Sequence, residues 1–225
     1  MAEAAVAATG ARIIIVDDHP LIRDGLKSRL QSEPGWTVCG EADDVASALR
    51  LIDDSKPDVA VVDLSLKSGN GIDLIKRIVS RNRGVRIVVS SMHDEQIYAE
   101  RAINAGAMGY VHKQNSAVQI VDAIREVLAG RLYASEVVRE RLLSRVIRRA
   151  GSAKANPVEQ LTDRELQVFE RIGRGKSVRE ISEELKVSPK TVETYRDRIR
   201  KKLQLESANR LVHYAVKWVT EHNSQ

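Results

Sequence analysis

The sequence is poor in cysteine and has no long apolar run, and these absences restrict where the protein can work. A single cysteine, Cys39, allows no disulfide framework, which fits a reducing compartment. No stretch approaches the roughly 18 apolar residues of a membrane span, and the Ala-rich start, residues 1–11, lacks the basic flank of a secretory signal. We therefore expect a cytoplasmic protein that does not bind membranes, with Cys39 as a buried structural thiol.

Charge is distributed unevenly along the chain, whose formal net charge is +5. Residues 1–130 hold 15 Lys/Arg against 18 Asp/Glu, whereas residues 131–225 hold 21 against 13. A chain of 225 residues is long enough for two domains with separate cores. The excess of positive charge therefore predicts a polyanionic partner for the C-terminal part.

Short apolar runs alternate with helical patterns over residues 1–130. The runs are typical of buried parallel strands, and the segments between them carry apolar residues at helical intervals. We expect strands at 13–16, 37–39, 59–62, 87–89 and 109–111, and helices at 21–30, 45–53, 71–79, 96–104 and 117–128. This βα repeat, about five units long, predicts a parallel sheet whose functional groups follow the carboxyl ends of the strands.

The remaining sequence has no strand-like run and is predicted to be helical. Residues 136–149 form a basic amphipathic pattern, and residues 151–157 lack periodicity and are typical of a linker. The glycines before Lys176 and Ser177 resemble part of a P-loop, but that pattern needs glycine where Glu170 stands, so we expect helix ends there. Helix starts are marked by Thr162 with Glu165, Ser177 with Glu180, Ser188 with Pro189, and Ser207.

Three aspartates follow two of the expected strands. Asp17 and Asp18 come directly after the first strand and Asp63 after the third, so adjacent parallel strands would bring the carboxylates to one edge. Clustered carboxylates repel unless a cation lies among them, and oxygen ligands suit Mg²⁺. The alternative is structural, with Asp17 and Asp18 capping the next helix and Asp63 capping a turn. The histidines show no metal-ligand spacing, so His19 and His93 are expected to be loop residues.

A hydroxyl and an ammonium group are expected at the same edge of the sheet. The fourth strand leads to Ser90 and Ser91, and the fifth leads to Lys113. A metal ion, an ammonium and a hydroxyl can surround a phosphoryl group, and a carboxylate can then act as the nucleophile that forms an acyl phosphate. The ordered set, with each member at a strand end, is more specific than any one residue.

Residues 11–130 resemble the response-regulator receiver domains of two-component systems. The matching segments are VDDHP (16–20), VDL (62–64), SMHDE (91–95) and GAMGYVHK (106–113), in the order and at the spacing of that family. The resemblance implies that Asp63 accepts a phosphoryl group from a sensor histidine kinase and that Lys113 contacts the phosphoryl oxygens. The implied ligands of Mg²⁺ are Asp18, Asp63 and the Ser65 carbonyl, with Asp17 assisting.

The resemblance also implies that Ser91 and Tyr110 form a switch pair. In that scheme, the Ser91 hydroxyl moves to a phosphoryl oxygen and Tyr110 turns inward to fill the space. Without the acidic set, both would be interpreted as ordinary turn and core residues. Two departures leave the loop geometry open, because KSGNG at 67–71 replaces a Met-Pro-rich loop and Gln114 stands where proline is common. Neither removes an atom that phosphoryl chemistry requires.

Residues 158–220 resemble the LuxR-type helix-turn-helix of the NarL/FixJ subfamily. The matching segments are LTDRE (161–165), ISEEL (181–185) and SPKTVETY (188–195). A small core is expected from Ile181, Leu185, Val187, Val192, Ile199 and Leu203, with the basic residues, Lys202 included, left for solvent or phosphate. The resemblance implies contacts with double-stranded promoter DNA from Lys190, Thr191, Glu193, Thr194, Arg196, Asp197, Arg198, Arg200 and Lys201. The alternative for such a run is a solvated charged helix.

Glu193 stands where this family often has lysine. A glutamate cannot neutralise a phosphate, but it can accept a hydrogen bond from cytosine N4 in the major groove. Alternatively, Glu193 points away from DNA and pairs with Lys190 or Arg196. The sequence leaves both roles open, and a binding selection on Glu193→Ala would distinguish them.

The last expected helix carries a stripe of Leu211, Ala215 and Trp218, with Val212, Val216 and Val219 beside it. A stripe of this kind more often packs into its own domain. Members of the family pair through this element, however, so the resemblance implies a homodimer that reads two half-sites.

These patterns predict a flavodoxin-like, doubly wound α/β receiver at 11–130 and an all-α, four-helix helix-turn-helix domain at 158–220. A linker helix and flexible linker are expected at 131–157. We expect a phosphorylation-dependent transcriptional regulator rather than an enzyme. One rival is a phosphatase or phosphotransferase that uses the same pocket, although Ser65 stands where such phosphatases usually carry a second aspartate. Another is a DNA-binding protein whose receiver is only a dimerisation scaffold.

Overall fold

The computed structural model describes residues 10–66, 69–81, 84–148 and 157–222. The chain divides into two compact units, residues 1–143 and 144–225, and each is described by itself. Most of the expected linker at 151–157 lies outside the described residues. In the part of the chain that the structure describes, no helix is both long and apolar enough to cross a membrane.

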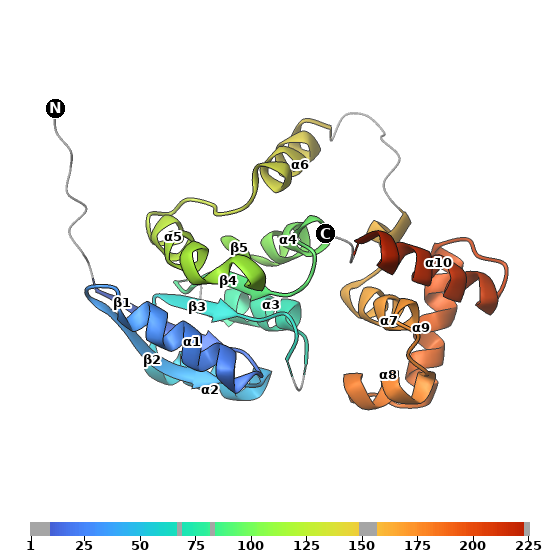
Figure 1. Cartoon of the computed structure of the whole chain (residues 1–225), viewed down its shortest axis with the longest axis horizontal. Coiled ribbons are helices and arrows are strands. Elements are labelled where there is room, and N and C mark those ends of the chain that lie inside the picture. Colours follow the sequence, from blue (N-terminus) through green and yellow to red (C-terminus); the bar gives the residue numbers. More distant parts are fainter. Residues whose placement is uncertain (1–9, 67–68, 82–83, 149–156, 223–225) are drawn as a thin grey trace. The chain divides into compact units, whose positions relative to one another are not determined.

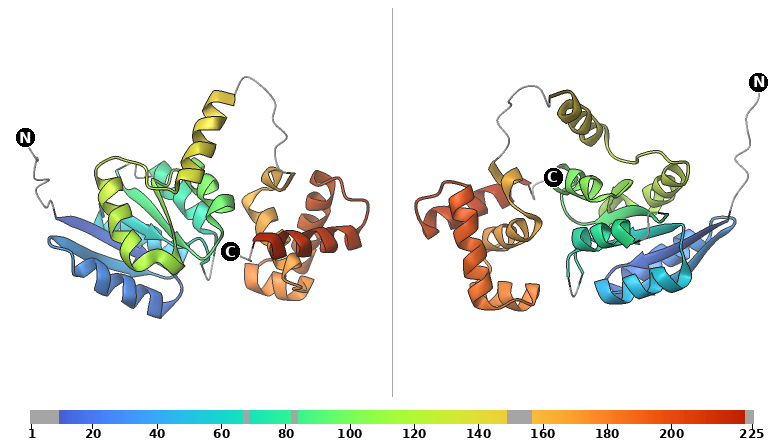
Figure 2. Two further views of the ribbon diagram at one scale, coloured as in Figure 1. Left: turned by 45° about the horizontal axis from the view of Figure 1, so that its top comes forward. Right: turned by 180° about the vertical axis from the view of Figure 1, so that it is seen from behind.

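The first unit is a parallel five-stranded sheet in the order β2-β1-β3-β4-β5. Its strands are β1 (Ala11–Val16), β2 (Trp36–Ala42), β3 (Val59–Val62), β4 (Arg86–Ser91) and β5 (Gly109–His112). Its helices are α1 (Pro20–Gln31), α2 (Val45–Ser55), α3 (Gly71–Arg81), α4 (Glu95–Ala105), the 3-10 turn η1 (Lys113–Asn115) and α5 (Ser116–Leu128). Helices α1 and α5 cover one face, and α2, α3 and α4 cover the other (Figures 1 and 2). The predicted doubly wound fold is confirmed.

Burial explains why the central strands were the most evident in the sequence. All of β3 and residues 13–16 of β1 are buried, because helices cover both faces of the sheet. The edge strand β2 is half-buried over most of its length and extends beyond the weak apolar pattern at 37–39. Cys39 in this strand is half-buried rather than buried, and its thiol donates to the Ile13 carbonyl oxygen at 3.4 Å.

An apolar core holds the sheet to the layer formed by α1 and α5. Side chains alternate across a strand, so every second residue of the central strands faces this layer. Each aliphatic side chain contributes about 1.5–3 kcal/mol when it is fully buried. The core therefore fixes the carboxyl ends of the strands, where the candidate site lies. Its members include Ile13, Ile15, Val59, Val61, Val88, Leu30, Ile120, Ile124 and Val127.

The chain after α5 returns to the outer edge of β5. The Tyr110 N–H donates to the Tyr133 carbonyl oxygen, and the Tyr133 N–H donates to the Met108 carbonyl oxygen, both at 2.9 Å. The helix α6 (Glu136–Arg148) follows, with Val138 buried. The sequence predicted this helix but not the pairing at β5, because one bridging residue leaves no strand-like run.

The second unit is helical, as predicted. It consists of the 3-10 turn η2 (Pro157–Gln160) and the helices α7 (Asp163–Gly173), α8 (Val178–Leu185), α9 (Pro189–Lys202) and α10 (Ala208–His222). The glycines of the segment GRGKS end α7 before Ser177 caps α8, as expected in place of a P-loop. The predicted helix starts are confirmed by hydrogen bonds to the side chains of Thr162, Ser177, Ser188 and Ser207.

Helices α8 and α9 form the helix-turn-helix. Lys186 ends α8 in the left-handed conformation, with a φ of 52°, and thereby turns the chain into α9. Leu185 and Val187, which were expected in the core, are only half-buried. The buried core of the unit includes Leu166, Phe169, Ile181, Val192, Ile199 and Leu203.

Helix α10 presents one apolar stripe inward and another outward. Leu211, Ala215, Trp218 and Val219 are buried within the unit, with the Trp218 ring edge-on to Phe169 at 5.5 Å. Val212 and Val216 are 39% and 43% exposed. The inner stripe therefore holds α10 in its own domain, which is the more common role of such a stripe.

Candidate functional site

Three aspartates converge at the carboxyl edge of the sheet. Asp17 and Asp18 follow β1, and Asp63 follows β3, which is paired with β1. The side chains of Asp17 and Asp63 are 2% exposed, whereas that of Asp18 is 19% exposed. Oxygen atoms of all three and a ring nitrogen of His19 lie within 4.8 Å of one another. The structure thus brings together the carboxylates that strand adjacency placed at one edge.

Lys113, directly after β5, reaches two of these carboxylates. Its Nζ lies 2.7 Å from Asp17 Oδ2 and 2.7 Å from Asp63 Oδ2. Burial by itself lowers the pKa of Lys113, but the negative charges of Asp63 and Asp17 outweigh it and hold the pKa above its usual value. A permanently charged ammonium group is therefore fixed beside Asp63.

The other oxygen of Asp63 gives the site its capacity for a cation. Asp63 Oδ1 is buried and has no hydrogen-bond partner among the described residues. Burial raises the pKa of Asp63 to about 6, against the opposing charge of Lys113 and with a further rise from Asp17. The positive charge of Lys113 thus offsets only part of the cost of burying the Asp63 carboxylate. The carboxylate oxygens present are the ligands that Mg²⁺ prefers, so the donor set fits that ion.

His19 joins the cluster, although the sequence predicted only a loop residue. Its Nδ1 lies 2.8 Å from Asp18 Oδ1 and 3.3 Å from Asp17 Oδ1. Its backbone N–H donates to Asp17 Oδ1 at 2.9 Å, so Asp17 also closes the turn that leads into α1. The alternative in which Asp17 and Asp18 cap α1 is wrong, because His19 is the N-cap residue and no side chain caps this helix. The signal for His19 was its adjacency to two aspartates, since no second histidine lies at metal-ligand spacing.

The expected switch pair lies beside the cluster, at the end of β4 and in β5. Ser91 is fully buried, and its hydroxyl accepts a hydrogen bond from the His93 N–H at 3.2 Å. Tyr110 is 2% exposed and lies inward, with its hydroxyl donating to the His93 carbonyl oxygen at 2.8 Å. Burial raises the pKa of Tyr110 well above its usual value, so the hydroxyl remains a donor. Both members of the pair therefore hold the β4–α4 loop through His93.

The His93 side chain adds contacts that the sequence did not indicate. Its Nε2 lies 2.9 Å from Ser65 Oγ, and its ring stacks on Tyr98 with centroids 4.3 Å apart. Ser65 belongs to the loop after β3, which is distant in the sequence from His93. Only the pairing of β3 with β4 brings the two loops together, so no local pattern could reveal this contact.

Gly71, the first residue of α3, allows the chain to pass close to Asp63. Its N–H donates to the Leu64 carbonyl oxygen at 3.0 Å. A Cβ atom at position 71 would lie 2.3 Å from the Asp63 carbonyl oxygen, so only glycine fits this approach without a shift of the backbone. Residues 67–68 of the unusual loop lie outside the described residues.

Helix α9 contains all of the residues that were predicted to contact nucleic acid. Its two acidic residues form ion pairs with arginines of the same helix. Glu193 Oε1 lies 3.1 Å from Arg196 Nη1, and Asp197 Oδ1 lies 2.9 Å from Arg200 Nη2. The first pair is one that the sequence offered as the alternative to base reading. The exposed members of the predicted set are Lys190, Glu193, Thr194, Asp197, Arg198 and Lys201, and the partly exposed ones are Thr191, Arg196 and Arg200.

Lys202, at the end of α9, binds inward rather than remaining for solvent or phosphate. Its Nζ lies 2.6 Å from Glu165 Oε2 and 3.2 Å from the Gln160 carbonyl oxygen. The Glu165 side chain is 3% exposed and also accepts from the Thr162 N–H at 2.8 Å. This lysine therefore ties α9 to the start of α7.

The two units define a receiver-type switch joined to a helix-turn-helix. Comparison with known proteins finds the same two parts. The response regulator receiver domain matches residues 13–125, and the luxR family of bacterial regulatory proteins matches residues 159–215. The chain belongs to the two-component response regulators of the NarL/FixJ subfamily, which combine these domains.

Relatives match over most of the chain. The response regulator UvrY of Escherichia coli K12 is 33% identical over 206 residues, which cover 91% of this chain and 93% of UvrY. The transcriptional regulatory protein LiaR of Bacillus subtilis is 36% identical over 206 residues, covering 91% of this chain and 96% of LiaR. A structure of RcsB from Salmonella enterica serovar Typhimurium, bound to promoter rprA in the presence of the phosphomimetic BeF₃⁻, matches with a TM-score of 0.63 and 26% identity. It covers 92% of this chain and 99% of that one.

Proposed function

We propose that this protein is a cytoplasmic transcriptional regulator whose binding to promoter DNA depends on phosphorylation of Asp63. The position of Asp63 carries the proposal. One oxygen of this buried carboxylate is held by Lys113, and the other has no partner among the described residues. The phosphoryl donor is a partner sensor histidine kinase, as the family resemblance implies.

The acidic cluster is the proposed Mg²⁺ site. Its ligands are the carboxylates of Asp17, Asp18 and Asp63 together with the carbonyl oxygen of Ser65. When bound, the ion would neutralise these carboxylates and the charge that develops on the phosphoryl oxygens. The incomplete compensation of Asp63, seen in its raised pKa, supports this assignment.

In the proposed transfer, a carboxylate oxygen of Asp63 attacks the phosphorus atom as the P–N bond to the donor histidine breaks. The electron pair of that bond returns to the imidazole, and Asp63 becomes an acyl phosphate. Lys113 and the Ser91 hydroxyl donate hydrogen bonds to the phosphoryl oxygens as their charge develops. The protein modifies itself, so we propose that it is not an enzyme and dephosphorylates itself slowly at most.

The C-terminal domain is the proposed output. Lys190, Arg198 and Lys201 of α9 are exposed and suited to phosphates of the DNA backbone. The RcsB structure bound to a promoter in the presence of BeF₃⁻ supports a link between phosphorylation and DNA binding. We propose a homodimer on two half-sites, with the exposed Val212 and Val216 of α10 at the contact.

Incubation with acetyl phosphate and Mg²⁺ tests the proposal. Intact-mass spectrometry should find one phosphoryl group on the wild type and none on Asp63→Asn. The matched control is Asp53→Asn, which changes an exposed aspartate on α2 and should be labelled like the wild type. Promoter binding, measured on the same samples, should increase only where the label is present.

Three results would contradict this scheme. A label on Asp63→Asn would place the acceptor elsewhere. Sustained hydrolysis of a phosphoester would favour an enzyme. Promoter binding that is the same with and without the label would favour a receiver that serves only as a scaffold.

A further inference from the structure

The acidic cluster contains one nitrogen donor among its oxygen donors. Carboxylate oxygens of Asp17, Asp18 and Asp63 and a ring nitrogen of His19 lie within 4.8 Å of one another. Within the described ranges, this is the one set of three or more carboxylate, imidazole or thiol groups that could hold a metal ion. Mg²⁺ prefers oxygen ligands, whereas imidazole nitrogen suits Zn²⁺ and other transition ions. The mixed donor set therefore bears on which ion binds.

The backbone holds the His19 ring against the carboxylates. The His19 N–H donates to Asp17 Oδ1 at 2.9 Å, and Pro20, whose ring restricts the backbone, follows at the first helical position. The ring nitrogen Nδ1 lies 2.8 Å from Asp18 Oδ1 and 3.3 Å from Asp17 Oδ1, so it is the nitrogen that faces the cluster. When the proton of the neutral ring is on Nε2, Nδ1 has a lone pair that can bind a metal ion. His19 is thus placed as a fourth ligand.

The charge of the cluster favours a divalent cation. Lys113 Nζ lies 2.7 Å from Asp17 Oδ2 and 2.7 Å from Asp63 Oδ2, so two carboxylates share one ammonium group. With Asp18 included, two negative charges remain without a matching positive charge among these side chains. The buried Asp63 Oδ1 has no hydrogen-bond partner among the described residues. A divalent ion would neutralise both charges and bind this oxygen.

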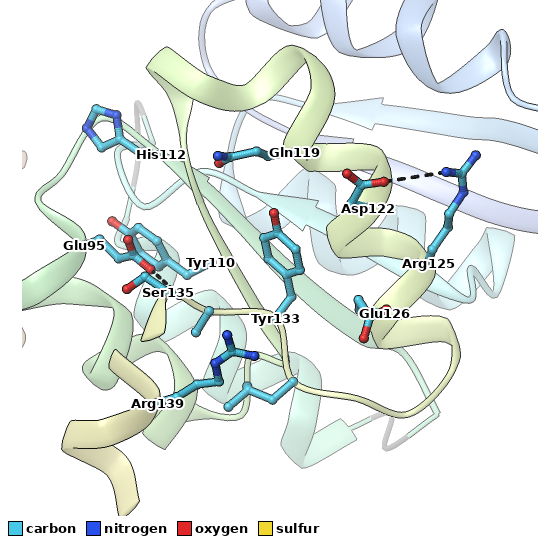
Figure 3. Close-up of a pocket in the computed structure, with 12 residues that line it drawn as sticks. Glu95, Tyr110, His112, Gln119, Asp122, Arg125, Glu126, Tyr133, Ser135 and Arg139 are labelled. Atoms are coloured by element: carbon cyan, nitrogen blue, oxygen red, sulfur yellow. Dashed lines mark hydrogen bonds and ion pairs between the residues drawn. The ribbon is translucent and has the colours of Figure 1, made fainter. Parts of the chain in front are cut away.

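A second group of carboxylates in the receiver is arranged differently. Figure 3 shows Glu95, Asp122 and Glu126 around a cavity of about 510 Å³. Asp122 pairs with Arg125 at 3.6 Å, and Glu95 accepts a backbone hydrogen bond at 3.0 Å. Glu126 pairs with Arg131 at 2.6 Å, and this bond lowers the pKa of Glu126, which is the opposite of the change in the acidic cluster. These carboxylates have protein partners of their own, so the cavity has no comparable need for a cation.

We propose that His19 makes the acidic cluster a site for Zn²⁺, which displaces Mg²⁺ and blocks phosphorylation of Asp63. Four protein ligands are the usual complement of a closed zinc site, whereas a reactive site keeps one position open. In the proposed function the bound ion must also neutralise the phosphoryl oxygens, and Zn²⁺ with four protein ligands has no position left for them. The block rests on the proposed function, whereas binding of Zn²⁺ by His19 does not. The four ligands are Asp17, Asp18, His19 and Asp63.

Calorimetric titration of the full chain with Zn²⁺, and separately with Mg²⁺, tests the nitrogen ligand. His19→Asn removes the ring nitrogen but keeps an N–H that can donate to Asp18, and the fold should tolerate it because the His19 side chain does not cap α1. Zn²⁺ binding should weaken by about tenfold or more, the usual cost of removing even an outer partner of a ligand. Mg²⁺ binding should weaken much less, because Mg²⁺ prefers oxygen. The matched control is His213→Asn, at an exposed histidine of α10, which should leave both affinities unchanged.

Two calorimetric results would overturn the proposal. Equal weakening of Zn²⁺ and Mg²⁺ binding in His19→Asn would show that His19 only orients Asp18 as a hydrogen-bond donor. Unchanged Zn²⁺ affinity would show that the ion binds without His19.

Long-range ¹H–¹⁵N spectra of the wild-type imidazole rings give a readout that does not depend on a variant. The Nδ1 signal of His19 should shift when Zn²⁺ is added and stay in place when Mg²⁺ is added, because only Zn²⁺ is bound through nitrogen. The ring signals of the exposed His213 serve as the internal control. Zn²⁺ binding without a shift at His19 would overturn the proposal.

Labelling with acetyl phosphate in Mg²⁺ tests the block. With free Zn²⁺ at about ten times its dissociation constant in the same buffer, about nine-tenths of the wild type holds the ion, so the label on Asp63 should fall about tenfold. His19→Asn should need about tenfold more Zn²⁺ for the same loss. Full labelling of Zn²⁺-bound wild type would overturn the block. Failure to label in Mg²⁺ alone would overturn the proposed function, while calorimetry and the imidazole spectra would still decide whether His19 is a ligand.

Discussion

The receiver pocket and helix α9 treat charge in opposite ways. In the pocket, Asp17, Asp63 and Lys113 are at most 5% exposed, and they interact where water screens poorly. On α9, Glu193 and Asp197 are more than half exposed and pair with arginines one turn away. Exposed pairs of this kind contribute little to stability. The buried charges are therefore fixed by the fold, whereas the charges of α9 can change partners when DNA binds.

The largest effect on stability is expected from Asp63→Asn. The folded-state pKa of Asp63 is raised from 3.8 to about 6, so the native protein binds this proton more tightly than the unfolded chain does. The carboxylate therefore destabilises the wild type progressively as the pH rises from about 4 to about 6, and fully above that range. Asp63→Asn should be more stable than the wild type at pH 7 by up to about 3 kcal/mol, with no gain near pH 4.

Urea unfolding at both pH values measures this effect, with Asp53→Asn as the exposed control. Equal stability of Asp63→Asn and the wild type at pH 7 would mean that burial of the Asp63 carboxylate costs no free energy of folding. The contrast between the buried charges of the pocket and the exposed charges of α9 would then be wrong.

A smaller effect is expected from Lys202→Ala, because Lys202 is the one described basic residue of α9 bound to a buried carboxylate. Its loss would remove the charged partner of the buried Glu165 carboxylate, which would keep its hydrogen bond from the Thr162 N–H, at a cost of about 2 kcal/mol. The neighbouring Lys201 is exposed, and Lys201→Ala should change stability by less than about 0.5 kcal/mol. Thermal unfolding of the two variants compares the loss of a lysine bound to a buried carboxylate with the loss of an exposed lysine in the same helix. Equal losses would refute it.

The smallest effect on stability is expected from Glu193→Ala. Loss of the exposed pair with Arg196 should change the free energy of unfolding by less than about 0.5 kcal/mol. Removal of a negative charge from the helix should raise affinity for DNA of any sequence. A binding selection checks the alternative, because a changed sequence preference would show that Glu193 reads a base. An unchanged preference would leave it only its pairing role.

The sequence could predict the features that depend on local patterns. The carboxylates of Asp17, Asp18 and Asp63 were predicted together because each follows a strand with a strong apolar pattern, and parallel strands align their ends. The helix starts at Thr162 and Ser177 were predicted because capping is local.

Several contacts between residues that are distant in the sequence were missed. The contact of His93 with Ser65 depends on neighbouring strands, and the ion pair of Lys202 with Glu165 depends on helix packing. Tyr133 was missed because an edge strand can be paired by a single residue without any periodic pattern. Local patterns therefore indicated the elements and the buried site, and tertiary contacts supplied the connections between them.

Position 71 limits how this receiver can diverge. Every substitution there adds a Cβ atom that would collide with the Asp63 carbonyl oxygen, whatever its polarity or size. In a saturation library selected for regulated transcription, glycine alone should survive at this position. Selection for phosphorylation thus restricts the sequence even at a residue that has no side chain and takes no part in the chemistry.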